Sequence, residues 1–225
     1  MPFKGWIMLI LSAALVTGCA SESDKKKDTH ENHQQHESNK AENENQTEKQ
    51  TYTDSSQASD DTSLTEINKK VEDQDGSITL KKYAKVNKQL QSDSIALTID
   101  EVKVLHYAPS VDLIDFFHGY TKQDEFPYVR VNVKIANKGK ESVHFNPIAQ
   151  IKTNQGETVT WKEDFYLEEL NGEIKPGEEK MGSLGFILNK TNIENLKTIT
   201  ITSSEVVDDQ KKKLTNSMEY KIDFK

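Results

Sequence analysis

Three histidines with a regular spacing are the side chains in this sequence best suited to hold a metal. His30, His33 and His36 recur at every third residue of the stretch HENHQQH. Imidazole is a preferred ligand of Zn²⁺, Cu²⁺ and Ni²⁺, and a helical turn would bring the three rings together. A protein that captures a metal or a solute with this cluster is therefore one hypothesis. The interpretation we favour is a solvated polar segment in which the histidines bind nothing.

The single cysteine of the 225 residues, Cys19, cannot form an internal disulfide. The chain before it is apolar from Gly5 to Val16 apart from one serine, and a lysine precedes that stretch. A short charged head, an apolar middle and small residues at the end are typical of a secretory signal peptide. The stretch is shorter than the roughly 20 residues of a membrane-spanning helix. Residues 1–18 are thus predicted to be a signal peptide, with an uncleaved anchor or a core helix as alternatives.

The four residues Val16-Thr17-Gly18-Cys19 resemble the lipobox of bacterial lipoproteins. The resemblance implies cleavage between Gly18 and Cys19, followed by attachment of a diacylglycerol with chains such as palmitate to the thiol. Two acyl chains anchor a protein stably, whereas one does not. We therefore expect a protein held by Cys19 on the extracytoplasmic face of a Gram-positive type of cell membrane. The alternative is an incidental cysteine at the end of a cleaved signal.

Residues 19–75, which begin with the lipidated Cys19, are predicted to form a disordered acidic tether. From 20 to 75 the chain has 15 acidic and 7 basic residues, and only seven from the apolar set. Such a segment buries too little surface to offset its ordering entropy. The net charge of −8 of the whole chain therefore belongs to the tether, and the remainder is nearly neutral. Without a basic stripe, the chain is not expected to bind nucleic acid.

Residues 76–225 are predicted to form an all-β antiparallel sandwich. Apolar and polar residues alternate over 129–135, which indicates a half-buried strand with one face in the core and the other toward solvent. The apolar positions are Val129, Val131, Val133 and Ile135, and the polar ones are Arg130, Asn132 and Lys134. Another alternating stretch has apolar residues at 95, 97 and 99 and then at 102 and 104. This change in the spacing predicts a bulge near Asp100–Glu101. Seven to nine short strands with regular turn signals are typical of a sandwich.

Three stretches of this region resemble immunoglobulin-like, telokin-like domains of unknown function found in lipoproteins of Gram-positive bacteria. They are FPYVRVNVKIANKGKESVHFNP, IKTNQGETV and IKPGEEKMGSLGFIL, and the resemblance covers 93–225. It implies an immunoglobulin-like fold. Because the family has no defined activity, it implies no mechanism.

An aromatic-rich segment at 106–128 is the candidate contact surface. Aromatic side chains dominate binding hot spots, so Phe116, Phe117 and Tyr120 are candidates for contact with a partner. The interpretation we favour is that VDLIDFF forms a short helix that plugs one end of the core. A third interpretation takes Asp112, Asp115 and His118 as metal ligands. Further along the chain, Trp161 is expected to pack in the core, as is common for tryptophan in sandwiches.

The sequence has no Gly-rich phosphate loop and no nucleophile elbow, and Cys19 is its one cysteine. We therefore expect neither an enzyme nor a cofactor, although a wall-active enzyme is kept as an alternative. The function predicted is that of a membrane-anchored extracytoplasmic lipoprotein that displays an immunoglobulin-like binding module at the cell envelope. An envelope protein, a wall polymer or a small ligand is the expected partner.

Overall fold

The computed structural model describes residues 57–224, all within one compact unit of the chain. Its strands are β1 (Lys70–Asp73), β2 (Gly76–Ser92), β3 (Ile95–Pro109), β4 (Phe126–Asn137), β5 (Val143–Phe145), β6 (Gln150–Thr153), β7 (Thr158–Thr160), β8 (Gly172–Ile174), β9 (Glu179–Ile187), β10 (Thr198–Thr202), β11 (Val206–Val207), β12 (Lys213–Thr215) and β13 (Glu219–Asp223). Its helical segments are α1 (Val111–Phe117) and the 3₁₀ turns η1 (Trp161–Glu163) and η2 (Ile193–Asn195). No helix within 57–224 is long and apolar enough to cross a membrane.

One layer is a five-stranded sheet in the order β1-β2-β3-β4-β9. Its long strands β2, β3 and β4 span 17, 15 and 12 residues and pair antiparallel along most of their length. The register between β3 and β4 shifts between Ile99 and Glu101. This bulge is the one that the change in alternation predicted.

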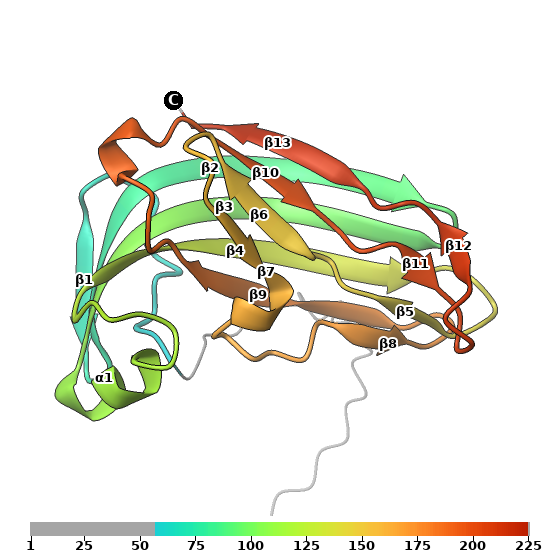
Figure 1. The fold of residues 1–225 in the computed structure, drawn as a ribbon, viewed down its shortest axis with the longest axis horizontal. Helices are drawn as coiled ribbons and strands as arrows, with labels where there is room; N and C mark the ends of the chain where they lie inside the picture. Colours follow the sequence, from blue (N-terminus) through green and yellow to red (C-terminus); the bar gives the residue numbers. More distant parts are fainter. Residues whose placement is uncertain (1–56, 225) are drawn as a thin grey trace, which may run out of the picture. The chain divides into compact units, whose positions relative to one another are not determined.

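The second layer consists of two four-stranded sheets, β13-β10-β6-β7 and β12-β11-β5-β8. In Figure 1 their short strands cross in front of the long strands of the first layer. The pairs within both small sheets are antiparallel, as in the large one. The described domain is therefore the all-β antiparallel sandwich that the sequence predicted, while its assignment to the immunoglobulin-like class stays a prediction.

A hydrophobic core fills the space between the layers. From β3 and β4 it takes the alternating residues Ile95, Leu97, Ile99, Val102, Val104, Val129, Val131, Val133 and Ile135. The second layer contributes residues such as Ile151, Ile199 and Ile222. Because side chains in a strand alternate between faces, the predicted apolar face of β4 is the one in this core.

The opposite face of β4 is also buried, which corrects the expectation that it meets solvent. Arg130 is 2% exposed and Asn132 is 1% exposed. On β3, the neighbouring Lys103 is fully buried. Burial of charged side chains requires partners, because an unpaired charge is very costly to remove from water.

The cover over this face comes from a part of the chain that was expected to be tether. Residues 57–69 lie on the sheet, with Ala58 and Leu64 each 3% exposed, and β1 pairs with the start of β2. The predicted boundary at 75/76 is therefore wrong for residues 57–75. This segment has few apolar residues, but Ala58 and Leu64 lie where the sheet can bury them. A count of apolar residues does not show where in the fold they lie. The rest of the predicted tether lies outside the described residues.

Asp61 holds this N-terminal cover to the sheet. Its Oδ1 accepts a short hydrogen bond from Arg130 Nη1, and Lys103 Nζ donates to its backbone carbonyl at 2.7 Å. Arg130 Nε also donates to Ser183 Oγ on β9 at 3.3 Å. Burial alone would lower the pKa of Arg130, but the facing carboxylate of Asp61 raises it, so the guanidinium stays charged.

We predict that Asp61→Ala lowers the free energy of unfolding by about 3–5 kcal/mol, because it leaves two buried cations without this carboxylate. Urea unfolding followed by circular dichroism measures the change. The matched control is Glu66→Ala in the same segment, whose side chain is 75% exposed and lies 3.7 Å from Lys69. It should cost under about 1 kcal/mol. Equal stabilities of the two variants would contradict the clamping role of Asp61.

Candidate functional site

The residues expected to carry lipid or metal lie outside the part of the chain that the structure describes. These are Gly18 and Cys19 at the expected cleavage point, and the histidines His30, His33 and His36. Their roles stay predictions. Within residues 57–224, no three His, Cys, Asp or Glu side chains are grouped so that they could hold a metal ion.

The sequence VDLIDFF forms the helix α1, as the favoured interpretation of this segment predicted. Phe117 is fully buried, with its ring centroid 4.9 Å from that of Phe126 and 5.3 Å from that of Phe165. The helix therefore closes a second, aromatic-rich core on the outer face of the large sheet. The expected partner contact is wrong for Phe117. Phe116 and Tyr120 are half-buried and pack against each other at 5.4 Å.

Two of the three proposed metal ligands of this segment, Asp115 and His118, lie close to each other, and Asp112 does not join them. His118 pairs with Asp115 at 3.6 Å and with Asp124 at 3.8 Å, measured from its two ring nitrogens, and both carboxylates are at least 90% exposed. Asp112 has no part in these pairs. The grouping of Asp112, Asp115 and His118 is therefore not a metal site in this structure.

The exposed aromatic residue of the domain is Trp161, which was expected in the core. It is 41% exposed, and every other aromatic side chain in 57–224 is buried or half-buried. Trp161 begins the 3₁₀ turn η1, which is held by a capping box. The carboxylate of Glu163 accepts from the backbone N–H of Thr160 at 2.6 Å and from its hydroxyl at 3.1 Å. The Thr-x-x-Glu spacing of this box is present in the sequence and indicates a helical turn that begins at Trp161, but it does not indicate that Trp161 is exposed.

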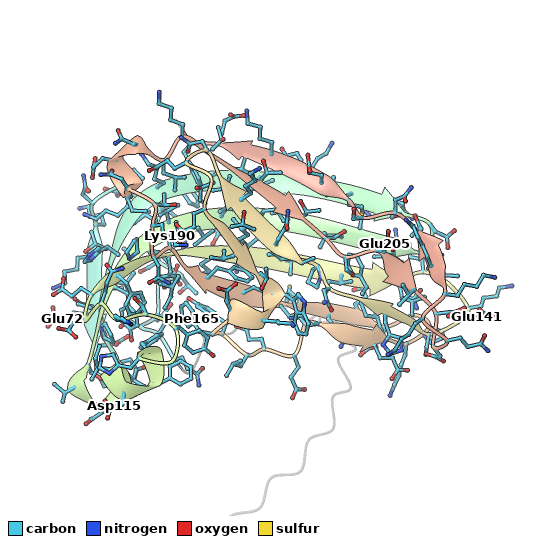
Figure 2. The ribbon with its side chains drawn as sticks, in the orientation of Figure 1. Glu72, Asp115, Glu141, Phe165, Lys190 and Glu205 are labelled. Atoms are coloured by element: carbon cyan, nitrogen blue, oxygen red, sulfur yellow. The ribbon has the colours of Figure 1, made fainter. Side chains whose placement is uncertain are left out.

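Three hollows surround η1 and adjoin one another through shared lining residues. A 3₁₀ turn has three residues per turn, so Trp161, Lys162 and Glu163 point in three directions. The first hollow, of about 390 Å³, and the third, of about 170 Å³, share Glu163 and Asn189. Lys162 lines both the third hollow and the second, which is about 370 Å³ and also holds Trp161. We call these three hollows together the η1 groove; Figure 2 draws their side chains, with Lys190 of the first hollow labelled.

The loop after η1 carries unusual backbone conformations that push a second apolar side chain into the groove. Leu167 has φ 59° and Glu169 has φ 53°, in the left-handed region that bulky residues rarely adopt. Phe165 and Tyr166 just before them are buried in the aromatic core. The chain must therefore turn outward at Leu167, which is 55% exposed beside Trp161 in the second hollow. Strain of this kind often marks a functional loop.

Asp164 attaches this loop to the large sheet. Its Oδ1 accepts from the backbone N–H of Gly185 at 2.8 Å and from that of Tyr166 at 3.1 Å. A side chain at Gly185 would meet the ring of Tyr166, so glycine is required for this close approach.

Burial raises the pKa of Asp164 to about 6, although hydrogen bonds from the backbone N–H groups lower it. The raised pKa reflects the cost of a carboxylate that is only 8% exposed.

The walls of the groove are tied together by side-chain hydrogen bonds. Asn189 accepts from the hydroxyl of Thr121 at 2.7 Å and donates to the carbonyl of Tyr120 at 3.2 Å. Glu157 accepts from the backbone N–H of Lys190 at 2.9 Å and from the hydroxyl of Thr191. The loops after α1, β6 and β9 are thereby held in one arrangement, as a preorganised binding surface requires.

The fold defines a small antiparallel β-sandwich domain, and the sequence places it in a family. The model of the DUF4352 family, described as a domain of unknown function, matches residues 65–213, so the chain belongs to this family. The match begins before residue 76, where the folded domain was expected to start. This agrees with the cover that residues 57–75 provide in the structure.

Comparisons with individual known proteins add no activity to this assignment. The uncharacterized protein YdhF of Bacillus subtilis (strain 168) is 39% identical over 181 residues, which are 75% of this chain and 77% of YdhF. A functionally unknown protein of Listeria monocytogenes EGD-e has a similar crystal structure, with a TM-score of 0.52 at 15% identity over 67% of this chain and 89% of that one. The candidate lipoprotein ycdA of Bacillus subtilis matches at a TM-score of 0.40 and 21% identity, over 61% of this chain and 39% of its own.

We predict that Asp164→Asn changes the pH dependence of stability. Below about pH 4 the carboxyl is protonated in the folded and unfolded states alike; as the pH rises, the unfolded chain loses this proton first, and the folded state loses stability until about pH 6. Asparagine keeps the acceptor and has no such proton. The stability of the native protein relative to Asp164→Asn should therefore fall by up to about 3 kcal/mol between low and neutral pH.

Urea unfolding at both ends of this pH range measures the difference. Glu169→Gln, on the same loop but exposed, is the matched control, and its stability relative to the native protein should change little with pH. A pH-independent difference for Asp164→Asn would contradict the burial cost assigned to this carboxylate.

Proposed function

We propose that this protein is a lipid-anchored binding module of the cell envelope that contacts its partner through the η1 groove. In this proposal a diacylglycerol on Cys19 holds the chain at the extracytoplasmic face of the membrane of a Gram-positive type of cell. The residues after Cys19 connect the anchor to the β-sandwich. The lipobox pattern Val16-Thr17-Gly18-Cys19 supports the anchor.

The exposure of Trp161 carries the proposal that the domain binds a partner. A folded domain gains stability by burying tryptophan, and this one buries or half-buries all its other described aromatic side chains. Trp161 is instead held outward by a capped turn, beside the exposed Leu167. Tryptophan is among the residues most enriched in binding hot spots. A site built from rigid loops around it is suited to recognition, and binding requires no catalytic group.

Replacement of the anchor cysteine tests the location. We predict that Cys19→Ala moves the protein from the membrane fraction into the growth medium, because no thiol remains to carry the acyl chains. Immunoblots of cell fractions measure the distribution, and incorporation of labelled palmitate into the native protein and not into Cys19→Ala confirms the lipid. Retention of Cys19→Ala on the membrane would rule out anchoring through this residue.

Replacement of the exposed tryptophan tests the binding surface. We predict that the soluble Cys19→Ala chain pellets with purified Gram-positive cell envelopes, and that adding Trp161→Ala weakens this binding by roughly ten-fold or more. Leu214→Ala is the matched control, because Leu214 is also an exposed apolar residue, at 45%, but lies on β12 and not in the groove. Equal pelleting of the two variants would exclude the η1 groove as the contact surface.

A further inference from the structure

The polar lining of the first hollow gives the η1 groove a particular chemistry. Uncharged amide and hydroxyl groups come from Gln155, Thr158 and Asn189, and carboxylates come from Glu157 and Glu163. Lys190 adds an ammonium group. Donors and acceptors are thus interleaved over a short distance. A ligand that matches them must itself present many groups that both donate and accept, as hydroxyls do.

Apolar surface lies close to this polar hollow. Tyr120 lines the third hollow, and Trp161 and Leu167 line the second. The ligand must therefore combine hydroxyl groups at its edges with apolar faces that can lie on an aromatic ring. Sugar rings have this combination, since their C–H groups form faces and their hydroxyls lie around the edge. Aromatic rings contribute large contact areas at a small entropic cost.

The charge of the groove disfavours a polyanion. Four carboxylates line the three hollows, those of Glu157, Glu163, Asp164 and Glu169, whereas the cations are Lys162 and Lys190. The negative excess would repel a ligand rich in phosphate or carboxylate groups, because juxtaposed like charges cost binding energy. An uncharged ligand meets no such electrostatic repulsion.

The arrangement of the hollows favours a chain over a single small molecule. The first and third hollows share two lining residues, and the third and second share Lys162. A linear ligand can therefore run past η1 from one hollow to the next. Each repeating unit of the ligand would contact a different residue of η1, in the order Glu163, Lys162 and Trp161.

We propose that the η1 groove binds an uncharged glycan chain, such as the polysaccharide strands of a cell wall. This inference rests on the proposed function and names the ligand class of the same site. Trp161 supports a sugar ring. Glu163 and Asn189 line both the first and the third hollow; the carboxylate of Glu163 accepts hydrogen bonds from the sugar hydroxyls, and the amide of Asn189 both accepts and donates them. Lys162 and Lys190 contribute hydrogen-bond donors without dominating the charge.

The experiment uses the soluble full-length Cys19→Ala chain and Gram-positive envelopes divided into three portions. One portion is untreated, one is treated with a protease, and one is digested with lysozyme, which cleaves glycan strands. The proposal expects binding to persist after the protease and to be lost after lysozyme. Loss after the protease alone would identify a protein partner and overturn the glycan, while leaving the proposed binding function intact. Absence of binding to untreated envelopes would overturn both.

A purified ligand gives a second, independent measurement. Chitohexaose, an uncharged hexasaccharide, is titrated into the same chain by calorimetry, with and without the substitutions. Trp161→Ala should weaken binding by roughly ten-fold or more, and Leu214→Ala should leave it unchanged. Glu163→Gln keeps the capping acceptor and should weaken binding only a few-fold. Circular dichroism verifies that each variant is folded.

Salt dependence separates an uncharged ligand from a charged one. Binding of envelopes and of chitohexaose should change by less than about two-fold between about 0.1 and about 1 M NaCl, because screening acts on charge pairs. Envelope binding that falls steeply with salt would identify a charged ligand and overturn the proposal. Envelope binding that persists after lysozyme digestion would also overturn the proposal.

Discussion

The described domain depends on one buried charge interaction, the contact of Asp61 with Arg130 and Lys103. These two cations occupy the outer face of the large sheet, where a strand of a half-exposed sandwich would meet water. Asp61 lies on the segment that covers this face, so its carboxylate supplies the opposite charge and closes the cover. Lys103 also lies 3.4 Å from Glu101, so the segment stabilises the sheet chiefly by pairing Arg130, whose charge would otherwise be buried without a partner carboxylate.

The covered face in turn positions the candidate site. The aromatic core beside the charged residues takes in Phe117 from α1 and Phe165 and Tyr166 from the loop after η1. Once these rings are buried, the chain on either side has little freedom. Trp161 and Leu167 are the apolar residues of the stretch 161–170 that are left exposed. The part of the groove around Trp161 and Leu167 is therefore a consequence of packing on the outer face of the sheet.

Part of the fold was predictable because it follows from local patterns. The alternation along β3 and β4 shows which face of each strand lies in the core, and the change in alternation shows where the bulge lies. Both are properties of single strands, and tertiary contacts did not alter them. The helix at VDLIDFF was also predictable. The site was not, because exposure of Trp161 depends on which segments cover its surroundings. The predicted domain boundary at residue 75 was wrong for the same reason, because composition does not show that Ala58 and Leu64 pack against the large sheet.

The sequence by itself determined the all-β class, the core face of β3 and β4 and the pattern around Cys19 on which the lipid anchor is predicted. These are matters of residue type and short spacing. Only the tertiary structure decided that Arg130 is buried, that Phe117 is a core residue and that Trp161 faces outward. Burial is a property of surfaces brought together from distant parts of the chain. Residues 57–69 precede the strands of the large sheet and residues 164–170 lie between β4 and β9, yet both segments pack on the same face of it.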